Sequence, residues 1–194
     1  ARRELIRLAR RELKQSAAMI LADYGYGGVD PEIVASLTSL KRRGLLTLDS
    51  RFRLAEYRGV DAATPNLEEV ERASQGRLRD EDEQAIAGAG MDLRKQLGAE
   101  AMLVTRGSWG MTLVERRRRA ARIPAFGSDE ITDVTGAGDT VIAVFTAARA
   151  AGGSWREAAE LANVAGGLVV LKRGTATVRR DELRHALRES WEEA

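Results

Sequence analysis

The sequence predicts an α/β protein in which a mostly parallel sheet is covered by helices on both faces. Short apolar runs that end in a polar residue alternate with longer segments of helical periodicity. Glycines and helix-capping residues separate these segments. With 194 residues and 44% hydrophobic content, the chain is long enough for one domain with a sizeable core and too short for two ordinary ones.

The first half of the chain is expected to alternate helix and strand. Asp30 and Pro31 provide an N-cap and a first-turn residue for a helix that we expect Gly44 to end. Asn66 precedes a further helix, and Gly98 follows another. We expect helices at 1–14 and 82–97, and strands at 17–22, 45–49, 62–64 and 101–105.

The second half changes from strands to helices. Two short apolar runs at 111–114 and 120–123, joined by an arginine-rich turn, are typical of a hairpin added to the sheet. Ser154 and Glu157 have the spacing of a capping box. We expect the last helices at 139–151, 154–171 and 181–190.

Composition excludes several classes of site. The 31 basic and 29 acidic residues leave a net charge of +2, without the strong excess that dominates nucleic-acid binders. The absence of cysteine excludes disulfides and thiolate metal sites, and the single histidine excludes a multi-histidine metal site. The sequence shows no signal peptide and no long apolar run, so we expect a cytoplasmic protein without a membrane partner.

The segment from Asp133 to Thr140 carries the most specific chemistry. Gly136, Ala137 and Gly138 directly precede an apolar helix, and their amides, with the positive end of the helix dipole, would form an anion hole. Asp139 then lies in the first turn, where its carboxylate can accept the proton of an attacking hydroxyl. On glycine spacing alone, a helix-entry loop with an acid placed for the dipole fits equally well.

The order of these residues differs from the two commoner nucleotide motifs. No Gly-Lys-Ser/Thr follows a glycine at P-loop spacing, and Val141 stands where a dinucleotide fingerprint has its third small residue. The segment instead resembles the Asp-x-Thr-Gly-Ala-Gly-Asp signature of the ribokinase-like (PfkB) carbohydrate kinases, matched at every fixed position. This resemblance implies a three-layer α/β/α fold, ATP as cosubstrate, a sugar or sugar phosphate as acceptor and Asp139 as the base.

The resemblance also implies residues that serve cations. Asn66 and Glu69 match the family's Asn-x-x-Glu motif, which orients Mg²⁺ and its waters around the phosphates. A second interpretation stays open, since Asn66 can simply cap the following helix. Asp133 and Thr135 match positions that hold a monovalent cation such as K⁺ in some relatives.

Four further positions are implied in nucleotide binding. Thr105 and Gly107 match the family's Thr-x-Gly contact at the end of an apolar strand. Asn163 and Gly174 match elements around the adenine and its neighbouring loop. Asn163 stands on an otherwise apolar helix, so we expect its amide to have a hydrogen-bond partner.

Within the family, the chain most resembles the heptose-7-phosphate kinases, on Leu21 to Gly25, Tyr57 to Gly59, Thr64 to Leu67 and Leu103 to Arg106 in addition to the signature. It departs at Tyr26, where relatives usually carry Lys, and at Ser50-Arg51, where they carry Pro-Lys. These departures leave the identity of the sugar open.

The resemblance places residues 1–194 in the C-terminal part of a single kinase domain. In the family, a long N-terminal segment supplies the first strands, most sugar contacts and the lid over the substrate. We expect this N-terminal portion and lid to be missing and the 194-residue chain alone to be inactive. A homodimer of the full-length protein stays open.

Two other functions are compatible with parts of the sequence. A nucleotide-binding or regulatory module would keep ATP and perform no transfer. The four arginines at 116–119 could form a nucleic-acid patch, but on a hairpin turn they more commonly form a solvated cluster that protects a sheet edge. We therefore expect no nucleic-acid partner.

Overall fold

The structure, a computed structural model, describes residues 1–40, 44–127, 134–174 and 176–192. Six strands form one sheet in the order β1-β2-β3-β4-β5-β6, so every strand pairs with its neighbour in sequence. The pairings from β1 to β4 are parallel, and those of β4 with β5 and of β5 with β6 are antiparallel. The strands are β1 Ala18–Asp23, β2 Leu45–Ser50, β3 Ala62–Ala63, β4 Ala101–Thr105, β5 Met111–Glu115 and β6 Ala121–Ile123. The predicted mostly parallel sheet and its added hairpin are confirmed.

The helices lie close to the predicted ranges. They are α1 Arg2–Gln15, α2 Pro31–Thr38, α3 Leu67–Ser74, α4 Glu83–Leu97, α5 Ala137–Ala150, α6 Trp155–Val170 and α7 Arg180–Glu192. Two short 3₁₀ turns were not predicted, η1 Leu54–Glu56 and η2 Gly107–Trp109. None of the described helices has both the length and the apolar character needed to cross a membrane.

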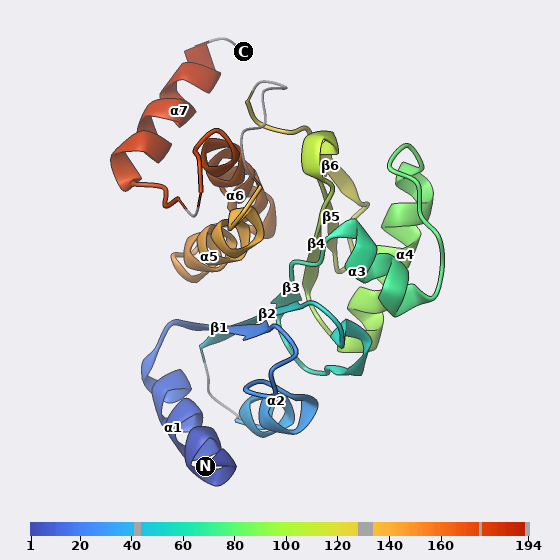
Figure 1. Cartoon of the computed structure of the whole chain (residues 1–194), viewed down its shortest axis with the longest axis vertical. Coiled ribbons are helices and arrows are strands. Elements are labelled where there is room, and N and C mark those ends of the chain that lie inside the picture. The colour runs from blue at the N-terminus through green and yellow to red at the C-terminus, as the bar shows by residue number, and fades with distance from the viewer. Residues whose placement is uncertain (41–43, 128–133, 175, 193–194) are drawn as a thin grey trace.

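The molecule has three layers, with α2, α3 and α4 on one side of the sheet and α5 and α6 on the other (Figure 1). Alternate residues of a strand point to opposite faces. Leu46, Leu48 and Met102 therefore enter the core beneath α2 to α4, whereas Ala101 and Leu103 enter the core beneath α5 and α6. This arrangement confirms the predicted α/β/α layering.

Local capping signals account for several helix ends. The Asp30 carboxylate accepts a hydrogen bond from the Ile33 amide at 2.9 Å, and Ser154 and Glu157 form both bonds of the predicted capping box. Gly98 ends α4 with φ 71°, a conformation that favours glycine.

The prediction that Gly44 ends the second helix is wrong. Helix α2 ends at Thr38, with Ser39 as its C-cap. A Cβ added to Gly44 would collide with the backbone carbonyls of Ser16 and Ala17. The glycine therefore serves a close backbone approach, next to the point where the Leu45 amide bonds to the Ala17 carbonyl at 2.8 Å and begins the β1–β2 pairing.

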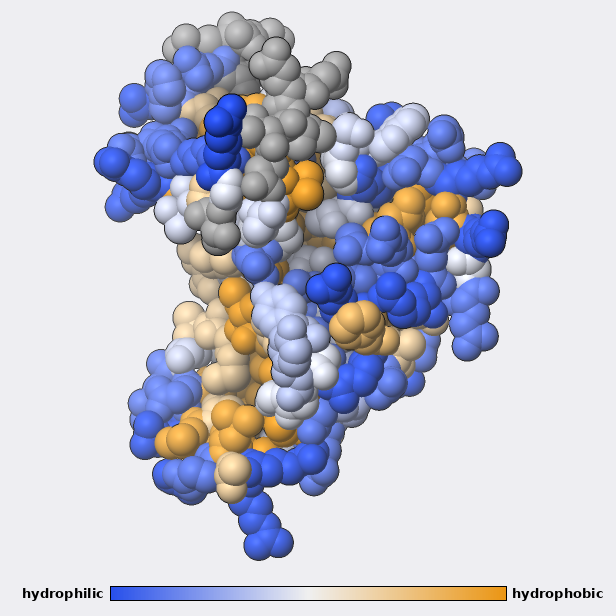
Figure 2. All heavy atoms as spheres, viewed as in Figure 1, coloured by the Kyte–Doolittle hydropathy of each residue, from blue (hydrophilic) through white to orange (hydrophobic). Residues whose placement is uncertain are grey.

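Helix α5 packs across β1 and β2, although it begins 87 residues after β2 ends. The hydroxyls of Thr47 on β2 and Thr146 on α5 lie 2.7 Å apart and are both buried. The surface is hollowed between α5 and the β1 end of the sheet, where apolar side chains are visible (Figure 2). The packing brings the first turn of α5 toward the carboxyl ends of β1 and β2.

Candidate active site

The start of α5 has the geometry that its glycines predict. Gly136 is the N-cap with φ 80°, the helix begins at Ala137, and Asp139 lies in its first turn. A Cβ added to Gly138 would meet nothing within 4 Å, so this surface is open. The amide of Ala137 donates to the Val134 carbonyl at 3.2 Å, so the turn itself uses one of the three predicted amides.

The Asp139 carboxylate contacts a residue from the far end of the chain. The hydroxyl of Tyr24, the residue after β1, donates to Asp139 Oδ1 at 2.5 Å across 115 residues. This hydrogen bond, with burial as the second cause, raises the pKa of Tyr24 to about 12. The phenol is therefore a neutral donor across the physiological pH range.

A second carboxylate, that of Asp49, lies within electrostatic range of Asp139. Asp49, near the end of β2, is half-buried, and burial followed by the charges of Glu69, Asp139 and Asp23 raises its pKa to about 7. Burial also raises the pKa of Glu69. The region thus holds an excess of negative charge, although no three metal-binding side chains among the described residues form a ready metal site.

Asn66 and Glu69 form a capping box at the start of α3. The Glu69 amide donates to Asn66 Oδ1 and the Asn66 amide donates to Glu69 Oε2, both at 2.9 Å. The helix-cap interpretation of Asn66 is confirmed, and the magnesium role of the pair stays a prediction. Asn66 also forms an isolated parallel β-bridge with Thr105, in which the Thr105 amide donates to the Pro65 carbonyl at 2.9 Å. The structure therefore brings the 66–69 and 105–107 motifs together.

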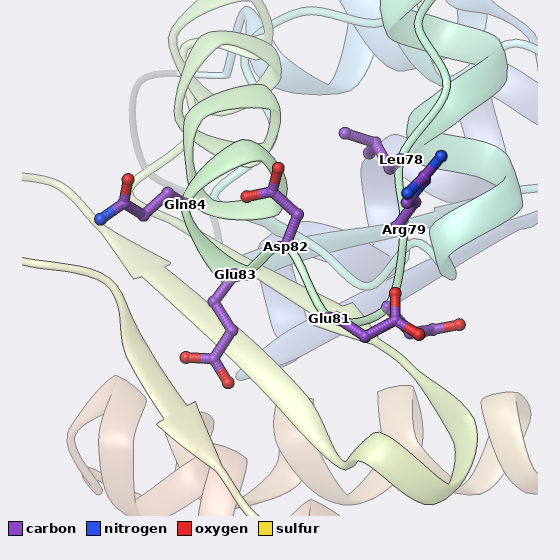
Figure 3. Close-up of a pocket in the computed structure, with 7 residues that line it drawn as sticks. Leu78, Arg79, Glu81, Asp82, Glu83 and Gln84 are labelled. Carbon is purple, nitrogen blue, oxygen red and sulfur yellow. The ribbon is translucent and has the colours of Figure 1, made fainter.

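Gly107 begins the turn after β4 with φ 53°, and no atom lies within 4 Å of an added Cβ. Beneath it, the buried Arg106 guanidinium donates to Thr112 Oγ1 at 3.1 Å and to the Asp80 carbonyl. This arginine ties the 78–84 segment to the end of β4. The same segment lines a pocket at the start of α4 (Figure 3), and none of the predicted site residues lines it.

The remaining predicted residues lie elsewhere around α5 and α6. Asn163 is 8% exposed and its side-chain amide donates to the Pro124 carbonyl at 2.8 Å, so the expected partner exists and is the backbone that follows β6. Gly174 follows α6 with φ 70°. Thr135 lies in the exposed turn before α5. Asp133 lies outside the described residues.

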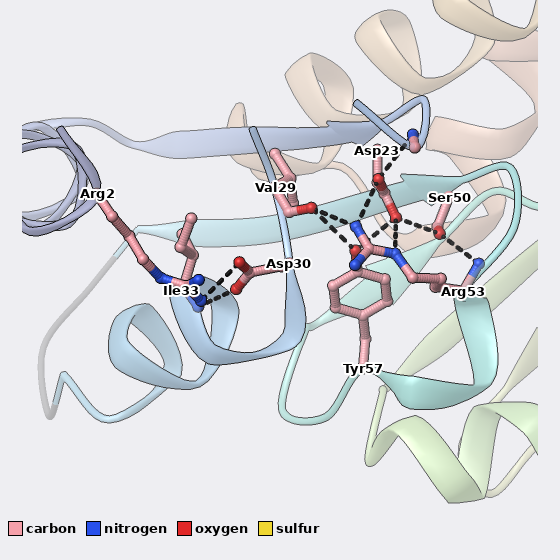
Figure 4. A network of polar contacts seen from close by, with 9 residues as sticks. Arg2, Asp23, Val29, Asp30, Ile33, Ser50, Arg53 and Tyr57 are labelled. Carbon is pink, nitrogen blue, oxygen red and sulfur yellow. Dashed lines mark hydrogen bonds and ion pairs between the residues drawn. The ribbon is translucent and has the colours of Figure 1, made fainter. Parts of the chain in front are cut away.

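A buried network at the end of β1 was not predicted (Figure 4). Asp23 is 3% exposed and accepts hydrogen bonds from Ser50 Oγ at 3.0 Å, Arg53 Nη2 at 3.0 Å and the Tyr57 hydroxyl at 2.5 Å. Burial alone would raise the pKa of Asp23, but these donors and the amide of Gly25 outweigh it and lower that pKa. The position of Asp23 at the end of a strand was the one sequence signal for this network. No local pattern connects Arg53 and Tyr57 to it.

Comparisons with known proteins identify the family. The model of the pfkB family carbohydrate kinases matches residues 41–182. Bifunctional protein HldE of Nitrosococcus oceani is 43% identical over 90% of this chain, and that of Hahella chejuensis is 42% identical over 92%. The match covers 36% and 37% of those relatives, so the chain spans little more than a third of their length.

Solved structures agree on the fold. Arabidopsis thaliana ribokinase, complexed with ribose and ATP, matches with a TM-score of 0.77 and 22% identity over 92% of this chain and 58% of its own. Escherichia coli phosphofructokinase-2, in complex with potassium, matches with a TM-score of 0.79 and 17% identity over 95% of this chain and 61% of its own. The predicted ribokinase-like fold is thereby confirmed. With the family match over most of the sequence, the chain belongs to the pfkB family of carbohydrate kinases.

Proposed function

We propose that the protein transfers the γ-phosphoryl group of ATP to a hydroxyl of a sugar or sugar phosphate, with Asp139 as the base. Asp139 takes the hydroxyl proton, the oxygen forms a bond to the γ-phosphorus, and ADP leaves with the bridging oxygen. The observation that carries the proposal is an exposed carboxylate in the first turn of a glycine-opened helix, in a chain of this family.

The start of α5 would stabilise the transferred group. Amides at a helix start point out of the helix, and the dipole adds positive potential there. Gly136 and Gly138 are the best placed of the three predicted amides, since Ala137 already donates to Val134. An oriented donor of this kind contributes roughly 3 kcal/mol to phosphoryl or acyl transfer.

Magnesium would enter with the nucleotide and neutralise charge on the phosphates. We assign Asn66 and Glu69 to orient it through bound water. The capping bonds do not exclude this role, because each carboxylate or amide oxygen has two lone pairs. The raised pKa of Asp49 supports the assignment, since a cation would relieve the repulsion among Asp49, Glu69 and Asp139.

The nucleotide would bind between the β4 end and α6. We assign Thr105, Gly107, Asn163 and Gly174 to it, with support from a fold shared with a ribokinase solved with ATP. Asp133 and Thr135 would hold the monovalent cation, and E. coli phosphofructokinase-2 in complex with potassium supports that assignment.

Heptose 7-phosphate is the acceptor that we favour. The resemblance to heptose-7-phosphate kinases runs through most of the chain, and the two HldE relatives are more than 40% identical to it. Because those relatives are much longer, the proposal concerns the complete protein that contains this chain.

The test uses the complete reading frame that encodes this chain and measures acceptor-dependent release of ADP. Asparagine keeps the shape of Asp139 but takes no proton, so Asp139→Asn should lower kcat by roughly 10²–10⁴ with little change in the KM for ATP. The matched control is Glu157→Gln, which neutralises a first-turn carboxylate of α6 instead of α5.

Two outcomes would contradict the proposal. If Asp139→Asn had the kcat of the wild type, Asp139 would not be the base. No acceptor-dependent ADP release with any sugar or sugar phosphate, from a folded protein that binds ATP, would remove the transfer reaction and favour a nucleotide-binding module.

A further inference from the structure

Asp139 is an exposed side chain in the first turn of a helix, and such a carboxylate ordinarily samples several rotamers. Here the Tyr24 hydroxyl donates to Oδ1 at 2.5 Å. Among the described residues, no hydrogen bond to Oδ2 is present. The Tyr24 hydroxyl therefore holds one carboxylate oxygen, while the described part of the chain leaves the other without such a bond.

We propose that Tyr24 is a positioning residue for Asp139, whose hydroxyl fixes one carboxylate oxygen so that Oδ2 is presented to the acceptor hydroxyl. The inference rests on the proposed role of Asp139 as the base. It assigns Tyr24 no bond to substrate and no proton transfer. Its effect is on orientation, which contributes strongly to rates of reactions between held groups.

Tyr24 can do this because both of its neighbours are fixed. Asp23 is anchored by Arg53, Ser50 and Tyr57. On the other side, the Gly25 amide donates to Asp23 Oδ1 at 3.0 Å, and a Cβ on Gly25 would lie 3.0 Å from the Phe52 ring. The backbone that carries the phenol is therefore held from both directions.

The same network holds the segment after Tyr24. Arg53 Nη2 donates to the Val29 carbonyl at 2.6 Å as well as to Asp23. One guanidinium thus joins the end of β1 to the segment that leads into α2 (Figure 4). Breaking this ion pair would be costly on the Asp23 side, because its carboxylate is buried and would remain as an unpaired charge.

Charge supports a neutral donor at this position. Tyr24, from the end of β1, and Asp49, from β2, both interact electrostatically with Asp139. Asp49 adds negative charge, so a carboxylate pair alone would push Asp139 away from this edge of the sheet. The Tyr24 phenol supplies the attraction that keeps Asp139 there.

The kinetic test is Tyr24→Phe in the protein from the complete reading frame. Loss of a hydrogen bond to a charged group should lower kcat roughly 10- to 100-fold while the KM for ATP changes less than about twofold. The control is Ser39→Ala, which also removes a hydroxyl hydrogen bond, the one to the Ser36 carbonyl at 2.8 Å on the exposed end of α2, and touches neither Asp139 nor the Asp23 network. We expect that control to keep kcat within about threefold.

A spectroscopic test does not depend on activity. In protein labelled with ¹³C at tyrosine Cζ, Asp139→Asn should move the Tyr24 resonance and leave that of Tyr26, which is 94% exposed. Tyr24→Phe and Tyr26→Phe assign the two resonances.

The outcomes separate the two proposals. The positioning role alone is overturned if Tyr24→Phe leaves kcat unchanged while the wild type is active. It is also overturned if the chemical shift of Tyr24 is the same in the wild type and in Asp139→Asn. A wild type without phosphoryl transfer overturns the proposed function, and the positioning role with it, whatever the resonances show.

Discussion

Asp49→Asn should stabilise the protein in a way that depends on pH. The pKa of Asp49 is raised from 3.8 to about 7 by burial and by the charges of Glu69, Asp139 and Asp23. At about 1.4 kcal/mol for each tenfold change in proton affinity, the ionised carboxylate costs the folded state about 4 kcal/mol at pH 8. Asparagine has the same shape and no charge, so it removes this cost.

The sign follows from proton binding. Between pH 3.8 and 7 the folded state keeps the Asp49 proton that the unfolded state has lost, so the free energy of unfolding falls as pH rises through this window. At pH 5 the cost is about 1.6 kcal/mol and at pH 8 about 4 kcal/mol. The stabilisation by Asp49→Asn should therefore grow by roughly 2–3 kcal/mol from pH 5 to pH 8.

Urea unfolding at pH 5 and pH 8, in buffer without nucleotide or magnesium, measures the stabilisation by Asp49→Asn. Asp92→Asn is the control, because that side chain is 81% exposed on α4, and it should change stability by less than about 0.5 kcal/mol at either pH. A stabilisation by Asp49→Asn that stays constant or shrinks with rising pH would refute the reasoning.

Two further predictions concern the fold. Thr47→Val and Thr146→Val each leave the other hydroxyl buried without its 2.7 Å partner, so each should lower the free energy of unfolding by about 1–3 kcal/mol. The double variant should lose less than the sum of the two. An additive double-mutant cycle, measured by urea unfolding, would argue against the hydrogen bond. Gly110→Ala should cost more than about 2 kcal/mol in thermal unfolding, since Gly110 has φ 82° and an added Cβ would lie 2.6 Å from the Ala125 amide nitrogen. At Gly88 in α4 an added Cβ meets nothing within 4 Å, so Gly88→Ala should stabilise the protein by up to about 1 kcal/mol. Equal effects of the two substitutions would contradict this prediction.

Local signals predicted most of the fold. The helix starts at Asp30, Asn66 and Ser154 follow from side chains that bond backbone amides three residues away, so neighbouring residues contain all the information. Gly136 at the start of α5 is also a local signal, but through its backbone, whose φ of 80° favours glycine. The prediction for Gly44 was wrong because the role of this glycine depends on the carbonyls of Ser16 and Ala17, which no local pattern connects to it.

The candidate site was only partly predictable for the same reason. Asp139 belongs to a continuous motif and could be found, but its partner Tyr24 lies 115 residues away. Asn66 and Glu69 show a second difficulty, since one pair of side chains satisfies a helix cap and matches a magnesium motif. Local geometry fits both roles, because the capping bonds leave each side-chain oxygen a further lone pair.

The strand order has a consequence for biosynthesis. Because β1 to β6 are adjacent in chain order, each strand can dock on a finished neighbour as it leaves the ribosome. Helix α5, which covers β1 and β2, emerges much later, and the Tyr24–Asp139 contact forms only then. A chain that stops before Ala137 would have all six described strands, with one apolar face of the sheet uncovered and without Asp139, and chaperones and proteases would bind such an exposed face.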